Sequence, residues 1–118
     1  MYGLAEGIDL SFLKGREVIQ VAVGLYQVIF ALDEKVTISV EGSYELHGTE
    51  GVSVWTPGAT QVAARALSLL GTTITNACAT SDGSLDLSFS NDESLVILDA
   101  SKSYESYQIT KPGSAIVV

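Results

Sequence analysis

The amino-acid sequence predicts a mainly β fold of the α+β class with one helix. Three observations predict it: apolar and polar residues alternate along several short segments, the two halves of the chain resemble each other, and residues 60–70 have helical spacing. The expected architecture is two tandem three-stranded antiparallel meanders, related by a pseudo-twofold axis and packed as a β-sandwich or a partly open barrel. One such unit cannot readily bury its apolar face alone, so two packed copies are the economical solution.

The two halves match when residues 10–46 are laid against residues 67–109. The segment LSFLKG aligns with LSLLG, with Lys14 as an insertion, and Val18 aligns with Ile74. Further along, the alignment pairs Tyr26 with Leu85, Val28 with Leu87, Phe30 with Phe89, Asp33 with Asp92, Glu34 with Glu93, Val36 with Leu95, and Ile38 with Ile97. We therefore expect repeat units of about residues 8–48 and 60–110 within a single domain of residues 1–118.

Period-two alternation predicts the strands of each unit. In LDLSF, residues 85–89, the leucines and the phenylalanine point to one face, while Asp86 and Ser88 point to the other. The short polar segments LDEK and SNDES, between the second and third strands of each unit, are typical of hairpin turns.

The segment between the two units changes its pattern midway. VSVW, residues 52–55, predicts a short strand that ends before Pro57. From Thr60, an acceptable N-cap, apolar residues recur at helical spacing to Leu70, and Gly71 stands where a C-terminal cap belongs. The apolar face expected for this helix consists of Val62, Ala66, Leu69 and Leu70.

The charge of the chain restricts its partners. Six Lys or Arg against fourteen Asp or Glu give a net charge of -8. This charge repels nucleic acid and anionic lipid, so we expect neither as a partner, and it would steer a basic protein toward the chain. The longest nearly apolar run, residues 21–32, is shorter than the roughly 20 residues that span a bilayer. The single cysteine, Cys78, cannot form an internal disulfide, which favours a reducing cytoplasm.

Residues suited to catalysis or metal binding are few. His47 is the only histidine and Cys78 the only cysteine, which argues against structural zinc. Cys78 lies among alanines on a predicted strand and is expected to be a small buried residue. SDGSLD, residues 81–86, faintly resembles a calcium loop but is too short, so we expect a turn there.

Acidic pairs also occur in the two predicted hairpin turns, as Asp33 with Glu34 and Asp92 with Glu93. Their equivalent places in the repeat favour a role in structure or solubility. We expect no catalytic residue and no cofactor, and the sequence supports no enzymatic activity, although it leaves one open.

The segment SKSYESYQI, residues 101–109, offers the clearest binding candidates. Tyr104 and Glu105 align with Tyr44 and Glu45 of the first unit, and Tyr107 falls opposite His47, which favours a structural role for part of the motif. Tyr107 is expected to pack with Ile109, and Tyr104 to be half-buried. Because tyrosine and tryptophan are enriched at interface hot spots, the candidate binding residues are Tyr104, Glu105, Tyr107, Trp55 and His47.

The chain resembles a family of small acidic bacterial proteins that carry a domain of unknown function. The resemblance rests on the Gly-x-Asp-Leu-x-Phe-Leu-x-Gly opening of GIDLSFLKG, on ALSLLGTTIT and on the Tyr-Glu-Ser-Tyr-x-Ile close. These motifs consist of packing and turn residues. The resemblance therefore implies a cytosolic protein and brings no catalytic residue.

The sequence thus favours a non-enzymatic protein-binding module, of the immunity or adaptor kind, with a basic protein as its partner. The alternative is a small-ligand binding protein or enzyme with a pocket between the two units, where Trp55, Tyr26 and His47 would gather. A homodimer is the third expectation, because the terminal AIVV or exposed strand edges could pair with a second copy. The same terminal segment could instead form a final strand of its own chain or be loose.

Overall fold

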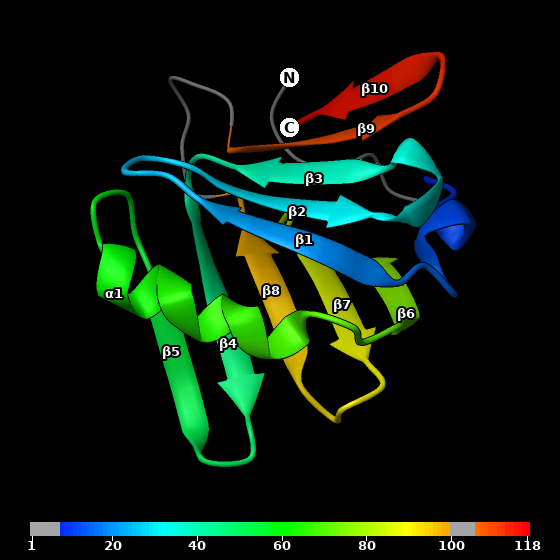
Figure 1. Cartoon of the computed structure of the whole chain (residues 1–118). Helices are drawn as coiled ribbons and strands as arrows, with labels where there is room; N and C mark the ends of the chain where they lie inside the picture. Colours follow the sequence, from blue (N-terminus) through cyan, green and yellow to red (C-terminus); the bar gives the residue numbers. More distant parts are fainter. Residues whose placement is uncertain (1–7, 100–105) are drawn as a thin grey trace.

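The computed structural model describes residues 8–99 and 106–118, which form two antiparallel sheets of five strands each (Figure 1). The elements in chain order are η1 (Ser11–Leu13), β1 (Val18–Val23), β2 (Val28–Leu32), η2 (Asp33–Lys35), β3 (Thr37–Val40), β4 (Ser43–Gly48), β5 (Gly51–Trp55), α1 (Thr60–Ala63), η3 (Ala64–Leu69), β6 (Ile74–Ala79), β7 (Leu85–Phe89), β8 (Ser94–Leu98), β9 (Tyr107–Lys111) and β10 (Ser114–Val117). The predicted mainly β fold with one short helix is confirmed.

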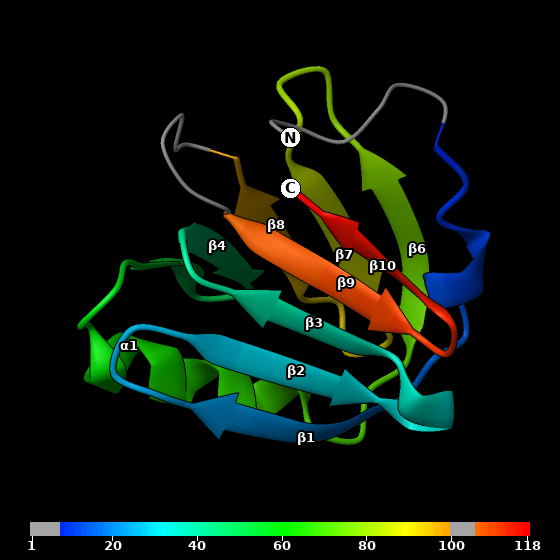
Figure 2. The same ribbon diagram turned by 90° about the horizontal axis from the view of Figure 1, so that it is seen from above.

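The strand orders show two meanders that exchange their terminal hairpins. Sheet 1 has the order β1-β2-β3-β9-β10, and sheet 2 has the order β5-β4-β8-β7-β6. The β4–β5 hairpin follows the first meander but pairs with β8 of the second, while β9–β10 follows the second meander and pairs with β3 of the first (Figure 2). Because each sheet keeps its edge strands, the described strands form an open sandwich and not a closed barrel.

Reciprocal backbone hydrogen bonds join the starts of β1 and β6. The Gly15 amide donates to the Ile74 carbonyl at 2.8 Å, and the Gly71 amide donates to the Val18 carbonyl at 2.8 Å. Both glycines have positive φ, 87° and 79°, a conformation that a side chain disfavours. The two loops therefore enter their strands through the same turn.

A single bridge marks the centre of this arrangement. Glu17 pairs with Thr73 across the two sheets, between the reciprocal bonds just described. Since Gly15 corresponds to Gly71 and Val18 to Ile74, Glu17 faces its own counterpart. The contact is therefore symmetric in the residues that it joins.

In the hairpin strands, the residue-to-residue match between the two units differs by two positions from the match predicted from the sequence. Val18 pairs with Leu32 and Ile74 pairs with Phe89, each just before a β-bulge, so Leu32 corresponds to Phe89. The predicted match of Phe30 with Phe89 was wrong. Side chains two residues apart share a face of a strand, so the apolar alternation is the same in both registers.

The helix predicted near residues 60–70 is present, but its C-terminal part, η3, is a 3₁₀ helix and not an α-helix. Thr60 is its first residue and not its cap, since Ala59 precedes it without a side-chain cap bond. The buried residues Ala63, Ala66 and Leu69 recur every third position, which fits the three residues per turn of the 3₁₀ segment η3. Leu70, assigned to the buried face by α-helical spacing, is instead 45% exposed. The α1–η3 segment contacts β5 and β1 and lies along one side of the sandwich (Figure 1).

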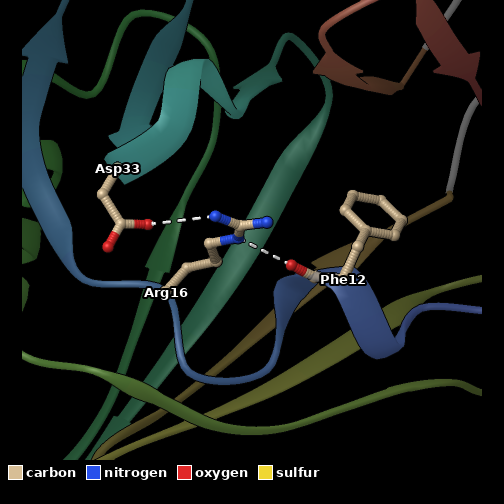
Figure 3. Close-up of polar contacts among 3 residues, drawn as sticks. All are labelled: Phe12, Arg16 and Asp33. Carbon is tan, nitrogen blue, oxygen red and sulfur yellow. Dashed lines mark hydrogen bonds and ion pairs between the residues drawn. The ribbon is translucent and has the colours of Figure 1, made fainter.

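Arg16 ties the first loop to the β2–β3 turn. Its Nε donates to the Phe12 carbonyl at 2.8 Å, and its guanidinium lies 3.6 Å from the Asp33 carboxylate (Figure 3). The Asp33 amide donates to Glu17, as the Ser90 amide donates to Thr73, so Asp33 corresponds to Ser90 and not to Asp92. The two acidic turn pairs therefore do not occupy equivalent places.

The C-terminal segment forms the edge strand β10 of sheet 1. It pairs with β9, and the buried Val118 accepts a hydrogen bond from Ser106 and exchanges bonds with Tyr107. Deleting these residues would remove part of the fold, so a homodimer through this edge, which stays a prediction, needs a different test. Replacing Ala115 on the outer face with lysine is one.

Candidate functional site

The predicted binding residues do not form one surface. Tyr104 and Glu105 lie outside the described residues. Trp55 and Tyr107 are buried, with 0% and 1% of their surfaces exposed, while His47 is half-buried on the outer face of sheet 2.

Trp55 belongs to an aromatic cluster in the core. Its ring stacks on Tyr44 with centroids 5.3 Å apart and planes 18° apart, and Tyr44 meets Phe30 edge to face at 5.9 Å. The Trp55 Nε1 and the Tyr44 hydroxyl are buried without a hydrogen-bond partner among the described residues. Trp55 therefore contributes packing and does not present a contact to a partner.

Tyr107 occupies the place in sheet 1 that Tyr44 occupies in sheet 2. Tyr107 pairs with Val40, and Tyr44 pairs with Ile97, at corresponding positions of the two meanders. The predicted equivalence of Tyr107 and His47 is thus corrected. Unlike Tyr44, the Tyr107 hydroxyl has a partner, since it donates to the Gly83 carbonyl at 3.0 Å.

Removing these two hydroxyls is expected to have opposite effects. Tyr107→Phe should lower the free energy of unfolding by about 1 kcal/mol, because it loses a buried hydrogen bond. Tyr44→Phe should leave it unchanged or raise it by up to about 1 kcal/mol, because the hydroxyl it removes has no hydrogen-bond partner in residues 8–99 and 106–118. Urea denaturation of both variants checks this, and equal losses would contradict the hydrogen-bond assignment.

The outer face of sheet 2 carries a row in which acidic and apolar side chains alternate. The register places its five residues side by side, one from each strand: Val54, Glu45, Val96, Asp86 and Cys78. Val54 is 51% exposed on the edge strand β5, and Cys78 is exposed rather than buried as predicted. We call this set the acidic–apolar row.

A second row runs beside it and is polar except at its edge. Its residues are Val52, His47, Ser94, Ser88 and Asn76. The His47 Nε2 lies 3.0 Å from the Glu45 Oε1, and Val52 is 56% exposed. Together the two rows place two exposed valines beside a histidine–carboxylate pair.

Charge divides unequally between the two sheets. Residues 43–99, which contain sheet 2 with α1 and η3, hold seven Asp or Glu and one Arg, a net charge of -6. Residues 8–42 and 106–118, which contain sheet 1, hold five Asp or Glu and four Lys or Arg, a net charge of -1. The negative potential is therefore concentrated on the side of sheet 2.

The outer face of sheet 1 is uncharged. The register places ten neutral residues on it: Gln20, Ala22, Ile29, Ala31, Thr37, Ser39, Gln108, Thr110, Ala115 and Val117. The one charged residue within the strands of this sheet, Lys111, lies over the Phe12 ring at 4.3 Å.

A pocket of about 580 Å³ opens at one end of sheet 2. It is lined by the β4–β5 hairpin, by η3 and by the β7–β8 turn, with Glu50, Arg65 and Glu93 as its charged residues. It thus lies between parts of the two predicted units, but Trp55, Tyr26 and His47 do not line it. The predicted gathering of these three residues around a pocket is absent from the described part of the chain.

A comparison with family models decides the family. The model of a family of unknown function, DUF6188, matches residues 10–118, nearly the whole chain. The chain belongs to this family. Searches of curated proteins and of solved structures found no match. The predicted resemblance to a domain of unknown function is confirmed.

The DUF6188 chain brings together no metal-binding cluster within residues 8–99 and 106–118. No three His, Cys, Asp or Glu residues lie close enough there to hold a metal ion. His47 on β4 and Cys78 on β6 are separated by two strands, on the order of 14 Å, so they cannot act as a nucleophile and its base. Among these residues no helix is long and apolar enough to cross a membrane.

The segment at residues 81–86 contains a turn, as predicted. The Asp82 carboxylate accepts hydrogen bonds from the Thr80 hydroxyl and from the Ser84 amide. These bonds, first that from Thr80, lower the pKa of Asp82. The carboxylate is thereby used to hold its own turn.

Proposed function

We propose that this DUF6188 chain is a non-enzymatic, cytoplasmic protein-binding module of the immunity or adaptor kind, which docks a basic protein on the outer face of sheet 2. The observation that carries the proposal is the acidic–apolar row, which lies on the side of the molecule with a net charge of -6.

The charge distribution favours this face over the other. A basic partner is attracted from a distance by the negative side of the molecule, which raises the association rate and orients the encounter. Sheet 1, with a net charge of -1 and a neutral outer face, offers little such attraction.

The local chemistry of the row supplies the short-range contacts. Val52 and Val54 provide exposed apolar surface at the free edge of β5, with Glu45 beside Val54 on β4, and Asp86 lies beside Val96 further along the row. Carboxylates next to apolar groups suit arginine-rich surfaces, because the guanidinium pairs with the carboxylate while its stem covers apolar surface.

Charge reversal on the row tests the proposal. The double variant Glu45→Lys, Asp86→Lys should capture from host lysate no more than about one tenth of the partner that the unchanged protein captures. The reason is that two attractive contacts become repulsive. The matched control is Glu34→Lys, Glu41→Lys, which makes the same change in net charge on the side of sheet 1.

The control separates local docking from overall charge. Quantitative mass spectrometry of the retained proteins should show the partner kept by the control and lost by the row variant. Equal retention by both variants, or equal loss, would exclude this face as the docking site. Circular dichroism of each variant shows whether the sandwich is intact.

A further inference from the structure

The pocket at the end of sheet 2 has the size and lining of a small-ligand site. Its volume of about 580 Å³ lies within the roughly 300–1,000 Å³ usual for such sites. Leu46 supplies apolar wall from the inner face of β4, while Thr49, Ser53 and Ser68 supply hydroxyl groups.

Three charged side chains line this pocket without neutralising one another. The ion pairs within 4.0 Å across the described ranges are Arg16 with Asp33 and Glu45 with His47, so none joins Arg65 to Glu50 or Glu93. Arg65 uses one N–H on the Ser53 hydroxyl at 3.1 Å. Because a guanidinium has five N–H groups, donors remain for an anionic ligand group.

The Glu93 carboxylate is held against the pocket wall. The Asn91 side-chain amide donates to Glu93 Oε1 and also to the Ser68 carbonyl at 3.3 Å, while the Glu93 amide donates to Asn91 Oδ1 at 3.1 Å. Gly48 lies directly beside the carboxylate, since a Cβ added at Gly48 would lie 3.3 Å from Glu93 Oε2. The absence of a side chain at Gly48 therefore leaves room for this carboxylate.

We infer that the pocket binds a basic α-amino acid, either free or as the C-terminal residue of a peptide. The α-carboxylate pairs with Arg65, the cationic groups pair with Glu93 and Glu50, and the aliphatic stem lies against Leu46. The lining carries a net charge of -1, which favours a ligand with a net charge of +1, such as arginine or lysine. This inference does not rest on the proposed docking of a protein partner.

Calorimetric titration with L-arginine, argininamide and L-norleucine tests the ligand class. Argininamide lacks the carboxylate and norleucine lacks the side-chain cation, so each should bind at least about tenfold more weakly than arginine. N-acetyl-glycyl-arginine distinguishes the sources: binding tighter than that of arginine indicates a peptide C-terminus, and weaker binding indicates the free amino acid.

Pocket variants assign the roles of the residues. Arg65→Gln should weaken arginine about tenfold and leave argininamide unchanged, and Glu93→Gln should weaken arginine but not norleucine. Gly48→Ala, at a position without positive φ, should shift the Glu93 carboxylate only slightly and weaken arginine less than Glu93→Gln does. The matched control Asp92→Asn removes the same charge one residue away, outside the pocket, and should bind arginine normally.

Two results would overturn the inference. One is the absence of binding heat with 10 mM arginine or peptide at about 50 mM salt, a concentration that saturates millimolar sites. The other is equal affinity for arginine, argininamide and norleucine. Thermal unfolding of each variant confirms that loss of binding is not loss of the fold.

Discussion

Trp55→Ala is expected to lower the free energy of unfolding by about 3–5 kcal/mol, the largest effect of any substitution considered for this chain. Trp55 is fully buried, stacks on Tyr44 and lies on the edge strand β5, where few other side chains reach the core. Its removal leaves a cavity in the core, on the inner face of β5, and Tyr44 loses its stacking partner.

The neighbouring strand position provides the control. Val54→Ala, on the outer face of the same strand and 51% exposed, should change the free energy of unfolding by less than about 1 kcal/mol. Urea denaturation followed by circular dichroism measures both. A Trp55→Ala variant as stable as Val54→Ala would show that Trp55 does not pack in the core.

Alkaline pH is expected to destabilise the fold through Tyr44 and Tyr107. Burial raises the pKa of Tyr44 to about 12, and burial followed by the charges of Asp99 and Asp82 raises the pKa of Tyr107 further. In the unfolded chain both ionise near pH 10. Their contribution is therefore complete below pH 10 and is lost above it, as the unfolded state releases protons that the folded state keeps.

The size of the effect follows from the same linkage. Between pH 10 and pH 12 the free energy of unfolding should fall by about 1 kcal/mol per pH unit for each of the two tyrosines, below the limiting slope of about 1.4 kcal/mol. Urea denaturation at several pH values measures this slope. Tyr44→Phe should halve it, whereas Tyr26→Phe, at a position 65% exposed, should not change it. A slope that does not depend on Tyr44 would contradict its burial in the folded state.

The local pattern of the sequence predicts much of the fold. Period-two alternation is sufficient to assign strands such as β7 and β8, and Gly15 and Gly71 mark the ends of the two helical segments. These signals are local, since they depend on which residues share a face or accept positive φ.

The exchange of hairpins between sheets is not visible in such patterns. Strand β4 alternates in the same way whether it pairs with β3 or with β8, because pairing is decided by the connections and by the packing of distant side chains. The two-residue error in the alignment of the two units has a related origin, because the same alternation fits both alignments.

The local sequence pattern also does not predict the candidate binding surface. In VSVW the valines outnumber the tryptophan, yet Trp55 faces the core and Val52 and Val54 face outward. Trp55 faces the core because its large ring fills the space beside Tyr44, which a valine is too small to fill. The segregation of charge depends on which sheet each acidic residue belongs to, and local patterns do not determine this.

Binding affinity as a function of ionic strength tests the proposed docking most directly. The dissociation constant of the captured partner should be measured for the unchanged protein and for Glu45→Lys, Asp86→Lys between about 50 and 500 mM salt. We expect tight binding at low salt that weakens steeply as salt rises, and weak binding with little salt dependence for the variant. A salt-independent dissociation constant, the same for both proteins, would contradict docking of a basic partner on sheet 2.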